Sequence, residues 1–129
     1  MSIHVEIVTP TATAWSGDVT EVQAPGFYGE FGVLPDHAPL LSVVRAGVVT
    51  LHSSEGEQRF VVGNGFVEAG PDKLTLLTEL CESADNVDKA AATTLLAESE
   101  AALAAAEAGS GEAVNAERNA DLARARLSI

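Results

Sequence analysis

The sequence is poor in cysteine and in basic residues, and both scarcities exclude classes of protein. With Cys81 as its one cysteine, the chain cannot form an internal disulfide or complete a cysteine-based zinc site. Seven Lys and Arg residues oppose nineteen Asp and Glu residues, which gives a net charge of −12. Binding to nucleic acids or anionic lipids needs basic residues, so we expect neither. Because no cationic residue lies near Cys81 in the sequence, we interpret it as a packing residue and not as a nucleophile.

Long hydrophobic runs are missing as well. No apolar stretch approaches the roughly 18 to 20 residues of a membrane span. The first six residues, Met1 to Glu6, lack the basic region and the apolar core of a signal peptide. We therefore expect a protein of the cytoplasm, or of the cytoplasmic side of a larger assembly.

Residues 1–84 read as short β-strands separated by turn signals. Ile3, Val5 and Ile7 alternate with polar residues, as in a half-buried strand. Similar segments recur about every 8 to 12 residues, which suggests a sandwich or barrel, and no helix-length segment favours a parallel βαβ fold. The predicted strands cover residues 3–7, 12–15, 19–24, 31–34, 40–45, 47–52, 58–62, 66–69 and 73–79. Turns are predicted at Ser16-Gly17-Asp18 and at Pro25-Gly26.

Residues 85–129 have a different composition and read as two helices. They contain no aromatic residue and no proline, and about a third of them are alanine. The first helix is expected over residues 87–108, with a modest apolar stripe of Val87, Ala91, Leu95, Leu96, Ala102 and Leu103. Gly109-Ser110-Gly111 ends it. The second helix presents one continuous face of Ala113, Ala116, Ala120, Ala123 and Leu127, and the short connection predicts an antiparallel hairpin.

The hairpin should be weakly docked, because an alanine face buries little apolar area. Such an element could change position as a switch, or it could be a static appendage. Arg118, Arg124 and Arg126 cluster near its C-terminal end. They either stabilise the helix dipole or form a cationic tip that docks on an acidic partner.

Residues 29–42, G-E-F-G-V-L-P-D-H-A-P-L-L-S, contain the most distinctive local pattern. Because proline has no N–H and cannot occupy a central strand, Pro35 to Pro39 should be a rigid, exposed loop that carries Asp36 and His37. The loop is a polar turn that could contact a partner. The residues themselves favour a β-sandwich interaction module with a helical hairpin, and a hydrolase that uses Asp36 and His37 is the alternative.

No other catalytic or metal-binding pattern is present in the sequence. No two of the histidines, His4, His37 and His52, share metal-ligand spacing, and His4 and His52 alternate with apolar strand residues as surface positions do. Gly63-Asn64-Gly65 lacks the lysine and the helix that follow a phosphate-binding loop, so we predict a turn.

The segment 29–42 closely resembles the G-E-x-G-(I/V)-x-P-x-H-x-P-L-(L/V) signature of the epsilon subunit of F-type ATP synthases. The start, I-H-V-E-I-V-T-P, is similar to that family's first strand, and residues 63–68 resemble its G-G-(F/I)-(L/V)-E segment. Residues 71–77, P-D-K-L-T-L-L, and the ending R-A-R-L-S-I also resemble the family. The resemblance covers the whole chain.

The resemblance implies a ten-stranded β-sandwich over residues 1–84 that binds the gamma subunit and the c-ring, and a regulatory helical hairpin over residues 85–129. It implies a non-catalytic rotor subunit without cofactors, held at the cytoplasmic face of a bacterial membrane, or less favourably a plastid one, only through its complex. The interface residues it implies are Glu30 toward the c-ring, His37 near gamma, and their neighbours Phe31, Pro35, Asp36 and Pro39. When the hairpin extends, Arg118, Arg124 and Arg126 would meet the alpha–beta catalytic head and inhibit ATP hydrolysis.

One departure from the family concerns nucleotide binding. Nucleotide-binding members carry I/L-D-x-x-R-A at the first helix, whereas this chain has Asp88 followed by Ala91 at the arginine position. Arg126 matches a second-helix arginine, but Leu122 stands where another would be. Because guanidinium groups make bidentate phosphate contacts, we expect ATP binding by this chain alone to be weak or absent.

Overall fold

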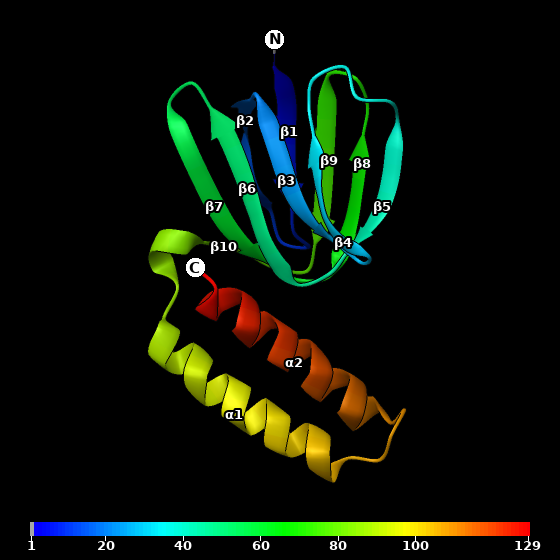
Figure 1. Ribbon diagram of the computed structural model, residues 1–129, viewed down its shortest axis with the longest axis vertical. Coiled ribbons are helices and arrows are strands. Elements are labelled where there is room, and N and C mark those ends of the chain that lie inside the picture. The colour runs from blue at the N-terminus through cyan, green and yellow to red at the C-terminus, as the bar shows by residue number, and fades with distance from the viewer. Residues whose placement is uncertain (1) are drawn as a thin grey trace.

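The chain folds into a β-sandwich followed by a two-helix hairpin, as the sequence predicts (Figure 1). The computed structural model describes residues 2–129. The strands are β1 (Ile3–Val8), β2 (Thr13–Val19), β3 (Glu21–Gly26), β4 (Gly29–Val33), β5 (Leu40–Val44), β6 (Gly47–Ser53), β7 (Gly56–Val62), β8 (Gly65–Ala69), β9 (Lys73–Thr78) and β10 (Cys81–Ser83). A short 3-10 helix, η1 (Ala84–Asn86), precedes α1 (Lys89–Ala105) and α2 (Gly111–Leu127).

All ten strands belong to one sheet that folds over into two layers. Their order is β10-β7-β6-β3-β5-β8-β9-β1-β2, and β4 pairs with β3. A single residue pair, Gly26 with Val44, joins β3 to β5, so the sheet turns a corner there. Strands β10, β7, β6, β3 and β4 form one layer, and β5, β8, β9, β1 and β2 form the other (Figure 1). The pair β1–β9 is parallel, but its strands lie far apart in sequence and form no βαβ unit.

Alternation along the strands builds the core between the layers. Strand β1 buries Ile3, Val5 and Ile7, while His4 and Glu6 stay partly exposed on the outer face. The other strands contribute in the same way, and the fully buried set includes Val22, Val33, Val44, Val49, Leu51, Val62, Val67, Leu74 and Leu76. Apolar burial, worth about 25 cal/mol per Å², is therefore concentrated in residues 3–83.

Two predicted turns are wrong. Residues Ser16-Gly17-Asp18 lie inside β2 and pair in register with β1. The glycine serves packing, because a Cβ at Gly17 would lie 2.8 Å from the Trp15 ring. Residues Pro25-Gly26 continue β3, where the Pro25 carbonyl accepts a hydrogen bond from the Arg45 N–H at 2.9 Å. Long-range pairing thus overrides both local turn signals.

The two helices follow the predicted hairpin, with one difference in α1. Helix α2 begins after Ser110, whose side chain accepts from the Ala113 N–H at 3.1 Å. It buries the predicted alanines 113, 116, 120 and 123, and Ala125 as well. In α1 the buried residues are Ala92 and Ser99, whereas the predicted stripe member Leu103 is 36% exposed. Small residues therefore form the contact between the helices on both sides.

Helix α2 lies between α1 and the sandwich. It contacts β6 and β7, while α1 packs mainly on α2. The C-terminal end of α2 returns to the sandwich, and the connection between the helices points away from it (Figure 1). None of the described helices is long and apolar enough to cross a membrane.

Candidate functional site

The outer face of the β5-β8-β9 layer carries a row of exposed hydrophobic side chains. Val43, Phe66 and Leu77 pair directly across the three strands. Their exposed fractions are 46%, 55% and 50%. Phe27, which is 59% exposed, extends the row, because its N–H donates to the Val43 carbonyl at 3.1 Å. We call these four residues the apolar band. A patch of this kind on a protein surface marks a site of protein–protein contact.

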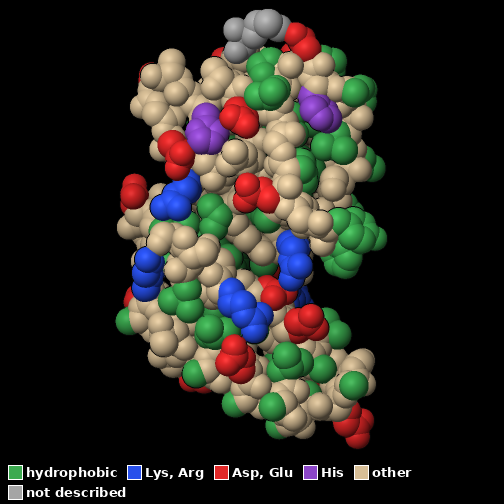
Figure 2. Space-filling view, viewed as in Figure 1, with side chains coloured by type: hydrophobic (Ala, Val, Ile, Leu, Met, Phe, Trp, Pro, Cys, Tyr) green, Lys and Arg blue, Asp and Glu red, His purple; other side chains and the backbone are tan. Residues whose placement is uncertain are grey.

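The apolar band continues into a groove against α2. The groove has a volume of about 630 Å³ and is lined by Phe27, Val43 and Phe66 on the sandwich side. Val114, Glu117, Arg118 and Asp121 of α2 line the opposite side. Figure 2 shows that the molecule narrows where the sandwich meets the hairpin. A partner seated on the apolar band would therefore also meet α2.

The apolar band was missed by the sequence predictions. Its members are adjacent to buried residues and point to the other face of the sheet: Val43 precedes Val44, Phe66 precedes Val67, and Leu77 follows Leu76. Because neighbouring strand residues face opposite sides, two consecutive apolar residues predict hydrophobic surface on both faces. That signal was present in three neighbouring strands.

The predicted interface residues lie at both ends of β4. Glu30 is exposed near the β3–β4 hairpin, next to Tyr28, which is 99% exposed. Gly29 has a φ of 129°, so the hairpin needs glycine there. Phe31 packs against the core and is only partly exposed. The loop with Asp36 and His37 follows the other end of β4, about 17 Å away at the usual strand rise.

The segment Pro35 to Pro39 is a loop between β4 and β5, as the prolines predict, with Asp36 and Pro39 exposed and His37 only partly exposed. Asp36 adopts a φ of 65°, and its N–H donates to the Pro71 carbonyl at 2.7 Å, which ties the loop to the β8–β9 turn. His37 Nδ1 donates to the Ala38 carbonyl at 2.6 Å. Among the described residues 2–129, no hydrogen bond or ion pair joins the Asp36 carboxylate to the His37 ring, whose Nδ1 donates to the Ala38 carbonyl instead.

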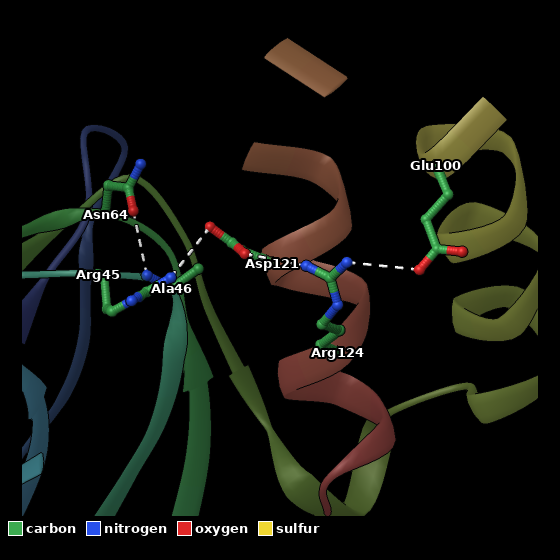
Figure 3. A network of polar contacts seen from close by, with 6 residues as sticks. All are labelled: Arg45, Ala46, Asn64, Glu100, Asp121 and Arg124. Carbon is green, nitrogen blue, oxygen red and sulfur yellow. Dashed lines mark hydrogen bonds and ion pairs between the residues drawn. The ribbon is translucent and has the colours of Figure 1, made fainter. Parts of the chain in front are cut away.

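The three arginines of α2 are paired within the chain in this conformation. Arg118 Nη1 lies 3.2 Å from Glu79 Oε2, and Arg126 Nη2 lies 2.7 Å from Glu82 Oε1. Arg124 contacts Asp121 on its own helix at 3.2 Å and Glu100 of α1 at 3.4 Å. Figure 2 shows the basic side chains gathered around the waist between sandwich and hairpin. Two of the three arginines predicted as a tip, Arg118 and Arg126, therefore contact the sandwich here, whereas Arg124 contacts the hairpin itself (Figure 3).

The residues considered for nucleotide contact have structural roles in this conformation. The Asp88 carboxylate caps α1 by accepting from the Ala91 N–H at 3.0 Å. The Arg126 guanidinium is occupied by Glu82. Nearby, burial and, to a smaller extent, the Glu82 charge raise the pKa of the Cys81 thiol to about 11. A protonated, half-buried thiol fits the packing role expected of Cys81.

Comparisons of the sequence with known proteins converge on one family. Residues 2–84 match the beta-sandwich domain of the ATP synthase delta/epsilon chain. The ATP synthase epsilon chain of Moorella thermoacetica is 42% identical over 88 residues, which are 67% of this chain and 66% of that protein. The epsilon chain of Rhodopseudomonas palustris strain BisA53 is 36% identical over 103 residues, which are 80% of this chain and 76% of that one.

One solved structure shares the fold of nearly the whole chain, and another shares the fold of about two thirds of it. A chain in the cryo-EM structure of the Euglena gracilis mitochondrial ATP synthase (OSCP/F1/c-ring, rotational state 1) superposes with a TM-score of 0.85 at 15% identity. The match covers 98% of this chain and 79% of that one. A chain of the Tetrahymena thermophila mitochondrial ATP synthase central stalk and c-ring gives a TM-score of 0.56 at 14% identity, over 67% and 70% of the two chains. At these identities the likeness concerns the fold alone.

Proposed function

Because this chain belongs to the delta/epsilon family of ATP synthase subunits, we propose that it is a non-catalytic rotor subunit of an F-type ATP synthase. In this role the sandwich, residues 1–84, connects the gamma subunit to the c-ring, and the hairpin, residues 85–129, restrains ATP hydrolysis. The complex would hold the chain at the cytoplasmic face of a bacterial membrane. The apolar band carries this proposal, because it offers a binding face on the domain that the family match covers.

The gamma subunit is the proposed occupant of the apolar band. Covering Val43, Phe66 and Leu77 would remove apolar area from water, and the flat row of three neighbouring strands suits a protein surface better than a small ligand. From the apolar band, gamma would extend over exposed Leu41 toward the loop with Pro35, Asp36, His37 and Pro39.

The c-ring is the proposed partner of Glu30. Because Glu30 and His37 lie at opposite ends of β4, one small contact could not include both, and their separation supports two different partners. Phe31 would act indirectly, since its partly buried ring holds the β3–β4 hairpin against the core.

The hairpin is the proposed regulatory element. Its contact with the sandwich is made by α2, whose buried residues are alanines, so little apolar area opposes its release. A released α2 could present its arginines to the alpha–beta head and slow hydrolysis. ATP binding at Asp88 and Arg126 should be weak or absent, because Ala91 supplies no guanidinium and Arg126 is already paired.

Binding to gamma tests the proposal. The chain should form a one-to-one complex with a gamma subunit from a related bacterial enzyme in size-exclusion chromatography with light scattering. It should show no ATP turnover by itself, because its described residues bring no acid–base pair together at the predicted loop. Failure to bind gamma would refute the rotor role, and turnover that follows the purified chain would favour an enzyme.

A further inference from the structure

Three polar side chains meet on the outer face of β1 and β2, outside the apolar band. His4 Nδ1–H donates to Asp18 Oδ1 at 2.9 Å, and His4 Nε2 accepts from the Ser16 hydroxyl at 3.3 Å. Because Asp18 holds the proton on Nδ1, it leaves Nε2 without a proton and able to act as a base. A carboxylate, an imidazole and a hydroxyl in this order activate a serine for nucleophilic attack. We call these three residues the serine triad.

The pairing of β1 with β2 brings the serine triad together. His4 lies opposite Asp18, and Glu6 lies opposite Ser16. The His4 N–H donates to the Asp72 carbonyl at 2.9 Å, on the β9 side of β1, so His4 and Asp18 exchange no backbone hydrogen bond. In such non-hydrogen-bonded pairs the side chains lie closer to each other. The serine triad therefore follows from the register of two strands.

The same pairing turns backbone N–H groups of β2 toward its free edge. Strand β2 ends the sheet order, and among residues 2–129 it pairs with β1 alone. Because the amides of Ser16 and Asp18 point away from β1, they lie along this edge. A backbone N–H beside a reacting serine can donate to the oxyanion that forms on the substrate carbonyl. Ser16 thus offers both a nucleophile and a donor for the oxyanion.

A pocket of about 350 Å³ runs along this edge, between β2 and the β6–β7 hairpin. Residues 15–19 form its wall on the β2 side, and Leu51, Glu55 and Gln58 belong to the opposite wall. Trp15 and Leu51 supply apolar surface, which suits a small acyl group. The carboxylates of Asp18 and Glu55 disfavour a substrate of negative charge.

Glu6 and Lys73 lie on the β9 side of the serine triad. Glu6 Oε1 is 3.6 Å from His4 Nε2 and 3.8 Å from Lys73 Nζ. The carboxylate would stabilise the imidazolium that forms when His4 takes the serine proton. The ammonium group would offset the repulsion between that carboxylate and the negative charge on the substrate oxygen.

We propose that the serine triad is a weak esterase site for small esters without negative charge. Ser16 Oγ attacks the carbonyl carbon while its proton passes to His4 Nε2. The tetrahedral oxyanion then expels the alcohol, which takes the proton from His4 and leaves acyl-Ser16. Water, deprotonated by His4, releases the carboxylic acid, and the proton returns to Ser16 Oγ, so each ester consumes one water. Asp18 is a positioning residue, because it acts through the imidazole.

The proposed activity goes beyond the rotor role and does not depend on it. The serine triad shares no residue with the apolar band, with the loop Pro35 to Pro39 or with the β3–β4 hairpin. Its reaction concerns esters and not ATP. Tests on the full chain alone can therefore address it without gamma.

Covalent labelling of the full chain tests the nucleophile. A fluorophosphonate transfers its phosphonyl group to an activated serine oxygen and releases fluoride, whereas an ordinary surface serine does not react. Peptide mass spectrometry should find the label on Ser16 and not on Ser54, which lines the same pocket. His4→Gln should slow labelling at least about tenfold. The matched change His52→Gln, at a histidine 3.6 Å from Glu57, should not change it.

Hydrolysis of p-nitrophenyl acetate measures turnover. Because exposed imidazoles also attack this ester directly, the rate that counts is the part that Ser16→Ala removes. The full chain should release p-nitrophenol at least about tenfold faster than Ser16→Ala. Asp18→Asn should lose most of the same difference by lowering kcat with KM unchanged, since the Nδ1 proton is no longer fixed. A merely structural role for Asp18 would not separate kcat from KM in this way.

The outcomes are distinct. A label on Ser16 that depends on His4, together with turnover that Ser16→Ala removes, supports the site. Absence of the label from Ser16 in the full chain refutes it, even if esters are hydrolysed. Equal turnover by the full chain and Ser16→Ala, with both folded by circular dichroism, refutes it as well. None of these results bears on binding to gamma, so the rotor role is tested separately.

Discussion

Replacing Phe66 with glutamate should weaken binding to the gamma subunit at least about a hundredfold, or roughly 2.7 kcal/mol. Phe66 lies at the centre of the apolar band, between Val43 and Leu77, and is 55% exposed. Central aromatic residues dominate the energetics of protein interfaces. On binding to gamma, a carboxylate there would lose its hydration, and the apolar band contains no cation that could pair with it. Isothermal titration calorimetry with purified gamma would measure the loss.

Leu103→Glu is the matched control for Phe66→Glu. It introduces the same charge at a surface leucine of α1, which is 36% exposed and lies outside the apolar band. Its affinity for gamma should stay within about threefold of the unmodified chain. Equal affinities of Phe66→Glu and Leu103→Glu, with both variants folded, would remove the apolar band from the gamma interface.

Gly65→Ala should destabilise the sandwich by about 3 kcal/mol and lower the melting temperature by roughly 10 °C. A Cβ at Gly65 would lie 1.8 Å from the Leu77 carbonyl oxygen and 2.8 Å from its carbon. Both atoms are backbone of β9, the neighbouring strand, so no side-chain rotation can relieve the contact. Strands β8 and β9 would have to move apart at the pairing of Gly65 with Thr78. Thermal unfolding followed by circular dichroism measures the effect.

The comparison variant is Gly70→Ala in the β8–β9 turn. A Cβ there would meet nothing within 4 Å, so its unfolding free energy should change by no more than about 0.5 kcal/mol. A loss below about 1 kcal/mol for Gly65→Ala would mean that β8 and β9 can shift apart cheaply. The close packing described for these strands would then be wrong.

Strand and helix positions could largely be predicted from local patterns. Alternation in β1 and the three- and four-residue spacing of alanines in α2 gave the buried faces, because each element buries only one side. The prediction of a turn at Ser16-Gly17-Asp18 was wrong, because a glycine that makes room for the Trp15 ring cannot be told in the sequence from a glycine that permits a turn. Local propensity could not reveal the pairing of β2 with β1.

The contact face of α1 could not be found by searching for large apolar residues. It consists of Ala92 and Ser99, seven residues apart, which approach α2 closely because they are small. The predicted stripe emphasised Leu103, which remains at the surface. Hydrophobicity identifies helices that bury bulky side chains, but a close contact between small residues leaves a weak signal.

The candidate surfaces were predicted less completely than the fold. The loop with Asp36 and His37 was located from its prolines, but the apolar band depends on which strands are neighbours. The arginines were identified, yet their partners Glu79 and Glu82 precede them by 39 and 44 residues. Such ion pairs depend on tertiary packing, which the spacing of residues along the sequence does not reveal.

We propose that the sandwich binds the rotor while the hairpin restrains hydrolysis. ATP hydrolysis by a complex reconstituted with the full chain, or with a chain ending at Ala84, tests this division most directly. The shorter chain should unfold cooperatively and bind gamma equally well, because its core lies in the sandwich. Its complex should hydrolyse ATP several times faster than the complex with the full chain. Equal hydrolysis rates, at equal occupancy of gamma by the two chains, would contradict the account.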